Sequence, residues 1–390
     1  MRATATSFVR RLARIIAMAA LLGPALPAAA AGSGYGVYVS TNPNGPNTVE
    51  AFKRNAKTGI LTSVGSFDTG GYGLTAINGA QSHAVVCTQT HVFVTNAGSN
   101  EISVFRIRND SGLELVTTIP SLGVRPVSLA INGKTLYVLN QGQPGVAPAR
   151  CVGFSIDTED DPVELDVSAV EFEATDVPTD VFFTQNGVRL VVLQNGANAI
   201  DTFTVGADGG LTAQRRLTNV NAPFGGAKHP RQPFVAFAAL ADDAAPGVIS
   251  IRATGTAIPT IVTQITASAD VDPCWAATTP NGKKLWTSNF QPASLSLYSV
   301  KSNGRLAAVS TYTPTSDSPG ALDITVDPRG KFLYQLRALD PAGGANPTPQ
   351  IDVLRIGSSS ADGGLQLVQS IQLSTSASSG SPTGIAVSEP

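Results

Sequence analysis

The chain has 390 residues, of which only 14% are charged, and a formal net charge of -2. Lys and Arg form no run outside the N-terminus, so the sequence shows no cationic footprint for phosphate backbones and predicts no nucleic-acid partner. A chain of this length holds two or three ordinary domains, or one repeat architecture.

The first segment, residues 1–31, has the pattern of a signal peptide. Three arginines precede the apolar stretch Ile15–Leu22, and the Ala run at Ala29–Ala31 suits cleavage. The apolar stretch is short for a bilayer, and no other stretch reaches about 18 apolar residues, so a retained anchor is the weaker interpretation. The pair Arg10-Arg11 raises the twin-arginine route as a lesser alternative. We expect an exported protein, secreted or periplasmic, without a membrane span in its mature form.

Residues 32–390 form one all-β domain by their pattern. Short alternating apolar runs bounded by Gly, Pro, Asn and Asp recur to the C-terminus, whereas helical spacing is almost absent. The runs group in fours, and the segment NAGSNEISVF, which begins at Asn96, returns as NGANAIDTFTV at Asn195. A recurrence of this kind indicates a repeat architecture.

Seven landmarks mark the end of the second run in each group, and their mean spacing of about 49 residues is typical of four-stranded propeller blades. They fall at Asn42, Asn96, Asn140, Asn195, Leu240, Asn289 and Arg337. The fifth group is the least regular, because the glycine- and proline-rich segment 221–232 replaces a first strand. The chain enters on a second strand, YGVYVST, and ends on a first strand, SPTGIAVSEP. We therefore predict a seven-bladed β-propeller whose C-terminal strand completes the N-terminal blade.

Cysteine usage and acidic residues point to neither a disulfide framework nor a metal site. Cys87, Cys151 and Cys274 are odd in number, so we expect buried thiols, with one bridge and one free thiol as the alternative. The acidic stretch 157–166 lacks the Gly and Glu positions of a calcium loop and is better explained as a solvated turn. We expect no metal and no cofactor.

One polar position recurs inside the apolar first strands. Alignment on the turn glycines puts in one slot Asp180, Trp275 and Asp323, and alignment on the preceding proline adds Ser128 and Gly225. Such a ring of side chains suits a ligand at the channel mouth. The alternative is hydrogen bonding between blades, in which an Asp carboxylate accepts a neighbour's N–H. For Trp275, a flat wall for a ligand competes with core packing.

Five segments together resemble the propeller-fold lactonase family, which includes 6-phosphogluconolactonase-like and carboxymuconate-cyclase-like proteins. They are NAGSNEISVFRI, RPVSLAINGKTLYVLN, NAPFGGA, CWAATTPNGKKLWTSN and PGALDITVDPRGKFLY. The resemblance covers about residues 35–387, but its motifs are mostly blade scaffolding, and one fold hosts many functions. It implies a lactonase, or a lactone-forming cyclase, with a small-molecule substrate.

Lactone hydrolysis needs a base for water and a cation or N–H donors for the carbonyl oxygen. We assign catalytic roles to His83, Arg125, Asp180 and Asp323, and ligand-binding roles to Lys228, Trp275 and Ser128. A structural role is the alternative for His83, and an ion pair is the alternative for Arg125.

The proposed substrate is the lactone of a small organic acid, bound by a monomer. Few cations lie near the predicted mouth and the chain carries an export signal, so we expect an unphosphorylated substrate. The sequence does not decide whether the protein is an enzyme. The alternative is a catalytically silent propeller that binds a small ligand, a cell-surface component or another protein.

Overall fold

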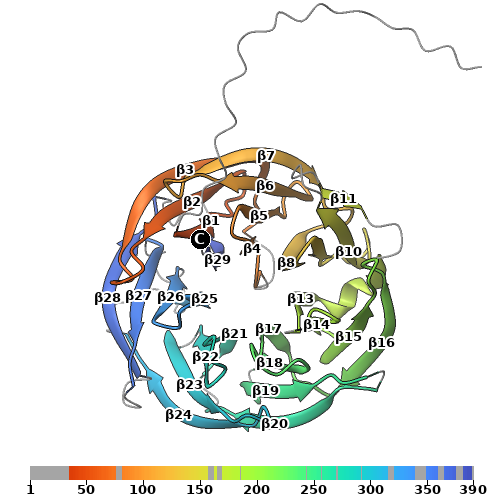
Figure 1. The fold of residues 1–390 in the computed structure, drawn as a ribbon. Helices are drawn as coiled ribbons and strands as arrows, with labels where there is room; N and C mark the ends of the chain where they lie inside the picture. The colour runs from red at the N-terminus through yellow and green to blue at the C-terminus, as the bar shows by residue number, and fades with distance from the viewer. Residues whose placement is uncertain are drawn as a thin grey trace, which may run out of the picture. The chain divides into compact units, whose positions relative to one another are not determined.

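The computed structural model describes residues 35–75, 81–156, 162–164, 169–184, 186–242, 244–255, 257–268, 271–290, 292–314, 320–338, 348–358, 364–374 and 381–388. They form seven β-sheets arranged as a ring, which confirms the predicted seven-bladed propeller (Figure 1). In these ranges, the 3-10 helix η1 (Ala174–Asp176) is the one helical element described over its full length. The predicted signal peptide, residues 1–31, lies outside the described residues.

The first four blades follow the chain from its N-terminal side. Blade 1 joins both chain ends, in the order β29 (Thr383–Val387), β1 (Gly36–Ser40), β2 (Pro46–Arg54) and β3 (Leu61–Tyr72). Blade 2 contains β4 (Val85–Cys87), β5 (His91–Asn96), β6 (Glu101–Ile107) and β7 (Leu113–Pro120). Blade 3 contains β8 (Pro126–Asn132), β9 (Thr135–Asn140), β10 (Ala149–Ile156), β11 (Pro162–Glu164) and β12 (Val170–Phe172). Blade 4 contains β13 (Pro178–Phe183), β14 (Arg189–Gln194), β15 (Ala199–Val205) and β16 (Leu211–Thr218).

The remaining three blades repeat the same order. Blade 5 contains β17 (Pro223–Lys228), β18 (Val235–Leu240), β19 (Gly247–Arg252) and β20 (Thr260–Thr266). Blade 6 contains β21 (Pro273–Thr278), β22 (Lys284–Asn289), β23 (Ser294–Val300) and β24 (Leu306–Tyr312). Blade 7 contains β25 (Ala321–Val326), β26 (Phe332–Arg337), β27 (Gln350–Ile356) and β28 (Leu365–Gln372).

The ring closes through β29, as the sequence predicts. This strand pairs antiparallel with β1, placing Val387 opposite Val37 and Ile385 opposite Val39. Ser388 strengthens the junction, because its Oγ accepts the N–H of Gly36 at 3.0 Å and its own N–H donates to the Gly36 carbonyl. Pairing the two ends removes the exposed strand edges that an open ring would leave.

The first strand of each blade lines the centre of the ring (Figure 1). Neighbouring first strands contact one another around the whole circle, in the order β29, β4, β8, β13, β17, β21, β25 and back to β29. Large side chains of the second and third strands fill the space between sheets, and Phe52, Tyr137 and Trp286 are fully buried there. The fourth strands face solvent and alternate polar with apolar residues, as half-buried strands do.

Asn side chains of the recurring turns form hydrogen bonds with the backbone just before the first strand of the next blade. Asn100 Oδ1 accepts the N–H of Arg125 at 2.8 Å, and Asn198 Oδ1 accepts the N–H of Ala222 at 2.8 Å. Arg125, Val177 and Ala222 each precede the proline that opens a first strand, and all three have positive φ, at 59°, 44° and 38°. This backbone region is costly for a residue with a β-carbon, and the Asn side chains satisfy two of these three N–H groups.

Two local expectations need correction. The segment 221–232 does supply a regular first strand, β17, whose glycines are demanded by close packing. A β-carbon on Gly226 would lie 2.3 Å from the Phe182 ring, and one on Gly225 would lie 2.6 Å from the Cys274 carbonyl oxygen. In blade 3 the outer position is divided, because both β11 and β12 pair with β10. Most of the acidic stretch 157–166 lies outside the described residues.

The three cysteines are free thiols, so the disulfide alternative is not realised.

Candidate functional site

The polar slot in the first strands links neighbouring blades around the channel. Ser128 Oγ accepts the N–H of Val181 at 3.1 Å, and Asp180 Oδ2 accepts the N–H of Gly226 at 2.8 Å. Asp323 Oδ2 accepts the N–H of Ile385 in the same way at 3.3 Å. Each acceptor thus reaches the first strand of the next blade. Hydrogen bonding between blades, the alternative considered for this slot, is therefore present.

His83 also links its blade to the next one, but it does so through its main chain and leaves its side chain partly exposed. It precedes β4, has φ 54°, and its main-chain oxygen accepts the N–H of Leu129 in the next blade at 3.1 Å. The main chain of His83 makes the link to the next blade, so the imidazole is not needed for that link and can make other contacts. The side chain is 37% exposed, and its ring lies 6.4 Å from that of Phe182 between centroids.

The imidazole of His83 reaches Asp180 across the blade between them. Its Nδ1 lies 2.8 Å from Asp180 Oδ1, and Ser128 Oγ donates to the same oxygen at 2.8 Å. The Asp180 side chain is fully buried and bonded from three blades, counting the Gly226 N–H. Such a carboxylate is held rigidly and fixes the orientation of the His83 ring, as the acidic partner of a catalytic histidine does.

The charge of His83 is set by the carboxylates around it. Burial lowers its pKa, but the charge of Asp180, the hydrogen bond with Asp180 and the charge of Asp323 outweigh it and raise the pKa to about 9. At neutral pH the ring is therefore an imidazolium whose Nδ1–H donates to Asp180. The other ring nitrogen, Nε2, makes no hydrogen bond within the described part of the chain, so its N–H is available to a ligand.

Asp323 is a buried carboxyl group whose pKa lies near neutrality. Burial raises its pKa to about 7, although the charge of His83 and the N–H of Ile324 lower it. Its Oδ1 accepts that N–H at 2.8 Å, and Oδ2 holds the longer contact to Ile385. A carboxyl group with a pKa near 7 can accept a proton from water at physiological pH.

Trp275 lies in the same slot between Gly225 and Asp323 in the ring order. It packs edge-on against Phe224 with ring centroids 5.4 Å apart, and it is 6% exposed. Its Nε1–H is buried and has no partner among the described residues. Core packing accounts for its ring, while its N–H remains a donor without an acceptor among the described residues.

The structure does not bring Arg125 and Lys228 together at one mouth. Arg125 precedes the first residue of β8, whereas Lys228 is the last residue of β17. First strands of six residues span roughly 17 Å, so the two cations mark opposite ends of the channel wall. The Arg125 side chain makes no hydrogen bond or ion pair among the described residues, and the charge of Lys228 acts on His83 by lowering its pKa.

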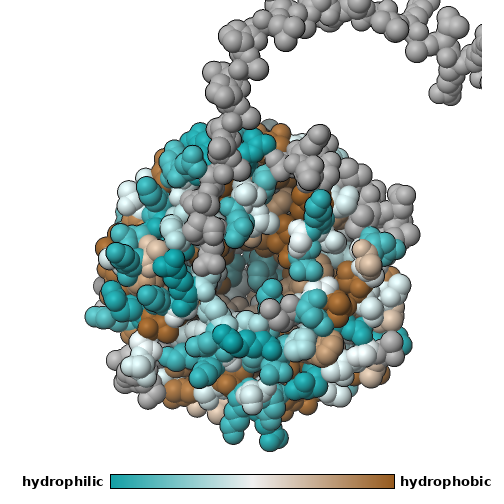
Figure 2. All heavy atoms as spheres, in the orientation of Figure 1, coloured by the Kyte–Doolittle hydropathy of each residue, from teal (hydrophilic) through white to brown (hydrophobic). Residues whose placement is uncertain are grey.

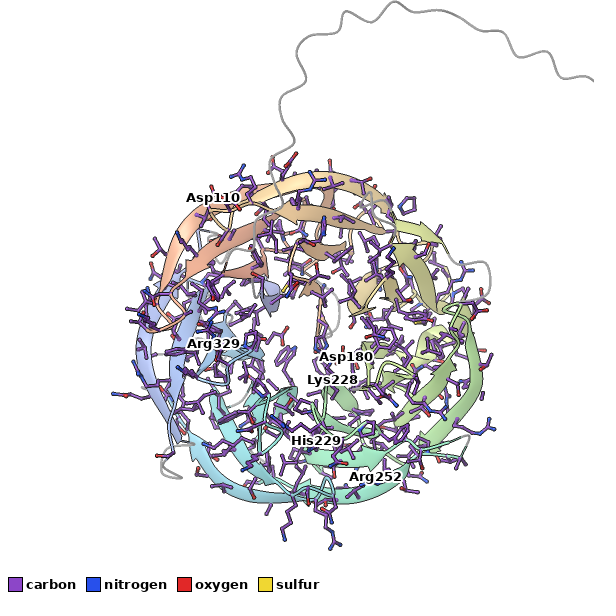
Figure 3. The ribbon with its side chains drawn as sticks, viewed as in Figure 1. Asp110, Asp180, Lys228, His229, Arg252 and Arg329 are labelled. Carbon is purple, nitrogen blue, oxygen red and sulfur yellow. The ribbon has the colours of Figure 1, made fainter. Side chains whose placement is uncertain are left out.

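His229 follows Lys228 in the turn and has a structural role. Its Nδ1 accepts the N–H groups of Arg231 and Gln232, both at 3.1 Å, and the residue is 3% exposed. Figure 3 shows Lys228 and Asp180 near the centre of the ring, with His229 farther out. Figure 2 shows the centre hollowed and lined by hydrophilic surface.

The pairing of His83 with Asp180 is the feature that sequence reasoning missed. The sequence predicts a catalytic role for each residue separately. It gives no indication that the His83 side chain, from blade 2, contacts Asp180 in blade 4. The positive φ of His83, shared at a similar place by Gly384 in β29, makes this reach possible. Within the described residues, no three His, Cys, Asp or Glu side chains gather as a metal site, and no helix is long and apolar enough to cross a membrane.

The fold and this site define a seven-bladed propeller with a polar, titratable channel. Residues 38–151 match the family described as "Lactonase, 7-bladed beta-propeller". The resemblance to the propeller-fold lactonases is thereby confirmed.

Curated relatives and solved structures agree with this family. A 6-phosphogluconolactonase of Serratia proteamaculans is 23% identical over 251 residues, which cover 62% of this chain and 72% of that protein. One from Pectobacterium carotovorum is 25% identical over 254 residues, covering 63% and 73%. The periplasmic gluconolactonase of Pseudomonas aeruginosa has a TM-score of 0.68 at 15% identity, covering 91% of this chain and 99% of that one. A putative 6-phosphogluconolactonase of Bacteroides fragilis has a TM-score of 0.66 at 18% identity, covering 92% and 99%. At these identities the structural similarity shows the fold alone.

Proposed function

We propose that the protein is an exported lactonase that hydrolyses the lactone of a small, unphosphorylated organic acid in the central channel. The observation that carries this proposal is the His83 imidazolium, held by buried Asp180 and electrostatically coupled to Asp323. Lactone hydrolysis requires a base for water and a donor for the oxyanion, and Asp323, with a pKa of about 7, and cationic His83, with a pKa of about 9, can supply them.

The reaction can be assigned to these groups with its protons balanced. The Asp323 carboxylate takes a proton from water as the water oxygen bonds to the lactone carbonyl carbon. The Nε2–H of His83 stabilises the oxyanion that forms on the carbonyl oxygen. The ring C–O bond then breaks, and the leaving alkoxide takes the proton from Asp323, which regenerates the carboxylate and yields a hydroxy acid. The same groups run in reverse would close a lactone.

Asp180 and Ser128 act as positioning residues in this scheme. Asp180 keeps His83 protonated and fixes its ring, and Ser128 holds Asp180 by its hydroxyl. Arg125 and Lys228, at opposite ends of the wall, would attract the carboxylate of substrate or product, and the Trp275 Nε1–H would donate to a ring oxygen.

An unphosphorylated substrate is supported by the small number of cations in the channel. A phosphate dianion usually requires several converging donors. The two candidate cations are separated along the channel, which suits a single carboxylate better than a phosphate. Export is supported by the pattern of residues 1–31, and the fold neighbour from P. aeruginosa is described as periplasmic.

A second candidate is a propeller that binds a ligand without turning it over. It is favoured by the complete use of the Asp180 carboxylate in hydrogen bonds that also join blades. In that case the channel would still bind organic anions, but His83 would serve only to recognise them.

The test is hydrolysis by purified mature protein of glucono-δ-lactone, its 6-phosphate and an aromatic lactone, compared with the Asp323→Asn variant. We expect turnover of an unphosphorylated lactone and a loss of 10²-fold or more in the variant, the size expected for removal of a general base. If the 6-phosphate were the one lactone hydrolysed, the assignment of an unphosphorylated substrate would be overturned. Binding of the lactones without hydrolysis would establish the second candidate instead.

A further inference from the structure

One face of the propeller gathers cations that are scattered in the sequence. They lie in or beside the turns that join first to second strands and third to fourth strands of blades 5, 6 and 7. Eight are exposed and two, Arg252 and Lys284, are partly buried. We call this set the cationic face: Lys228, Arg231, Arg252, Lys283, Lys284, Lys301, Arg305, Arg329, Lys331 and Arg355.

Contacts between neighbouring turns show that these residues share one face. Arg252 Nη2 donates to the carbonyl of Asn303 in the next blade at 2.8 Å, and Lys284 Nζ donates to the carbonyl of Gly357 in the blade after it at 2.8 Å. The antiparallel order of each sheet places both kinds of turn at the same end. Figure 2 shows hydrophilic side chains over these blades, and Figure 3 labels Lys228, Arg252 and Arg329 among them.

Within the part of the chain that the structure describes, no carboxylate pairs with the cations of the cationic face. None of the ten forms an ion pair among the described residues. The described carboxyl group in these turns, Asp327, is fully buried and lies 3.6 Å from the buried Arg54. Side chains of this set instead contact carbonyls, the Tyr35 hydroxyl and aromatic rings.

An exposed apolar side chain accompanies the charges. Ile258, in the turn between β19 and β20, is 57% exposed at this face, next to the turn that carries Lys301 and Arg305. Tyr35, the first described residue, also lies here, since Arg329 Nη2 donates to its hydroxyl at 3.0 Å. The predicted export signal precedes Tyr35 in the sequence.

We propose that the cationic face binds peripherally to the surface of an anionic phospholipid bilayer. The cations come from turns of three adjacent blades at one end of the strands, and such a broad distribution suits a planar partner. Lysine and arginine near an anionic leaflet are attracted by its surface potential, and an apolar tip such as Ile258 can enter the interface. A nucleic acid would use the charges but would leave Ile258 without a role.

The experiment is co-sedimentation of the mature protein with vesicles of phosphatidylcholine alone and with 30 mol% phosphatidylglycerol. We expect binding to the anionic vesicles only, lost as NaCl is raised to 0.5 M, because the Debye length then shortens to a few ångströms. Equal binding to both vesicles, or none at low salt, overturns the proposal. A duplex DNA of 20 base pairs is titrated in parallel, and tighter binding to it than to the vesicles also overturns the proposal.

Matched variants locate the binding surface. The triple variant Lys283→Gln, Lys301→Gln and Lys331→Gln lowers the net charge by three at the cationic face. The control Tyr72→Glu, Val146→Glu and Ala244→Glu lowers it by three on exposed residues at the opposite ends of the strands. Each cation near an anionic surface contributes about fivefold in affinity, so the first variant should bind about 100-fold more weakly and the control nearly as wild type. If both variants bound the vesicles equally weakly, the effect would come from net charge, and the cationic face would not be the binding surface.

Discussion

His83 Nδ1 and Asp180 Oδ1 lie 2.8 Å apart although 97 residues and an entire intervening blade separate them. The contact crosses Ser128, whose hydroxyl donates to the same carboxylate oxygen. Residues of three blades therefore fix the orientation of the His83 imidazole. That orientation depends on the closed ring rather than on any local segment.

Replacing the histidine should separate catalysis from structure. His83→Gln retains a hydrogen-bond donor to Asp180 but removes the cationic N–H that faces the channel. We expect lactone turnover to fall by roughly 10²–10⁴-fold. The fold should be retained because the link to Leu129 uses the backbone, although the melting temperature at neutral pH should fall as buried Asp180 loses its cationic partner. Steady-state kinetics and thermal melts on the same preparation measure both. Full activity in this variant would remove His83 from the mechanism.

The pH dependence of kcat/KM should be bell-shaped. Activity requires Asp323 to be deprotonated, so it should rise as pH increases through about 7. It also requires His83 to be protonated, so it should fall as pH increases through about 9. In Asp180→Asn the alkaline limb should move to lower pH, because the main negative charge that raises the His83 pKa is gone. An unchanged alkaline limb in that variant would assign it to another group.

Protein stability should also follow the charge of His83. Its pKa in the folded protein, about 9, exceeds the ordinary value of 6.5, so the folded state binds the proton more tightly. This contribution is fully present below about pH 6.5 and is lost as pH rises through 9. Urea unfolding at pH 6.5 and pH 9.5 should show a larger loss in wild type than in His83→Gln. Parallel losses in the two proteins would contradict the linkage.

Deleting residues 382–390 should open the ring. The deletion removes β29, including buried Ile385 and Ala386, and leaves the inner edge of β1 unpaired. We expect aggregation at concentrations where wild type remains in solution, measured by size-exclusion chromatography with light scattering. Deleting only residues 389–390 is the control and should have little effect. A truncated protein as stable and as well dispersed as wild type would be incompatible with closure by β29.

The buried pair of Arg54 and Asp327 should matter more than an exposed pair. Their side chains are both 0% exposed, at a distance of 3.6 Å, and they connect blade 1 to blade 7. Arg54→Ala would leave a buried carboxylate without its cation, which costs about 3–5 kcal/mol of unfolding free energy. Arg108→Ala, which breaks an exposed contact with Asp110, should cost at most about 1 kcal/mol. Similar costs in the two variants would refute this ranking.

Repetition made the fold predictable from sequence. Period-2 runs, recurring Asn turns such as those at Asn96 and Asn195, and unmatched chain ends specify strand order and closure without long-range information. The segment 221–232 was harder to interpret, because its glycines are required by residues of neighbouring blades that pack against them. Gly226 is required by Phe182, a neighbour from another blade that no local pattern reveals.

The site was only partly accessible to the same reasoning. The slot that contains Ser128 and Asp180 follows from alignment of the strands, since side chains at one register face the same way. The contact of His83 with Asp180 depends on a left-handed backbone at His83, which sequence periodicity does not encode. The cationic face was missed for a related reason. Its residues come from turns of separate blades, so they form no run along the chain.

The pairing of β1 with β29 has a consequence for biosynthesis. Val37 meets Val387, so the first blade lacks its inner strand until almost the entire chain has been made. Contacts between residues so distant in sequence form late, because a very long loop must close first. A nascent chain therefore carries an incomplete blade throughout translation and remains unable to complete its native ring. On our proposal that the protein is exported, this delay would leave time for translocation of the unfolded chain before the ring closes.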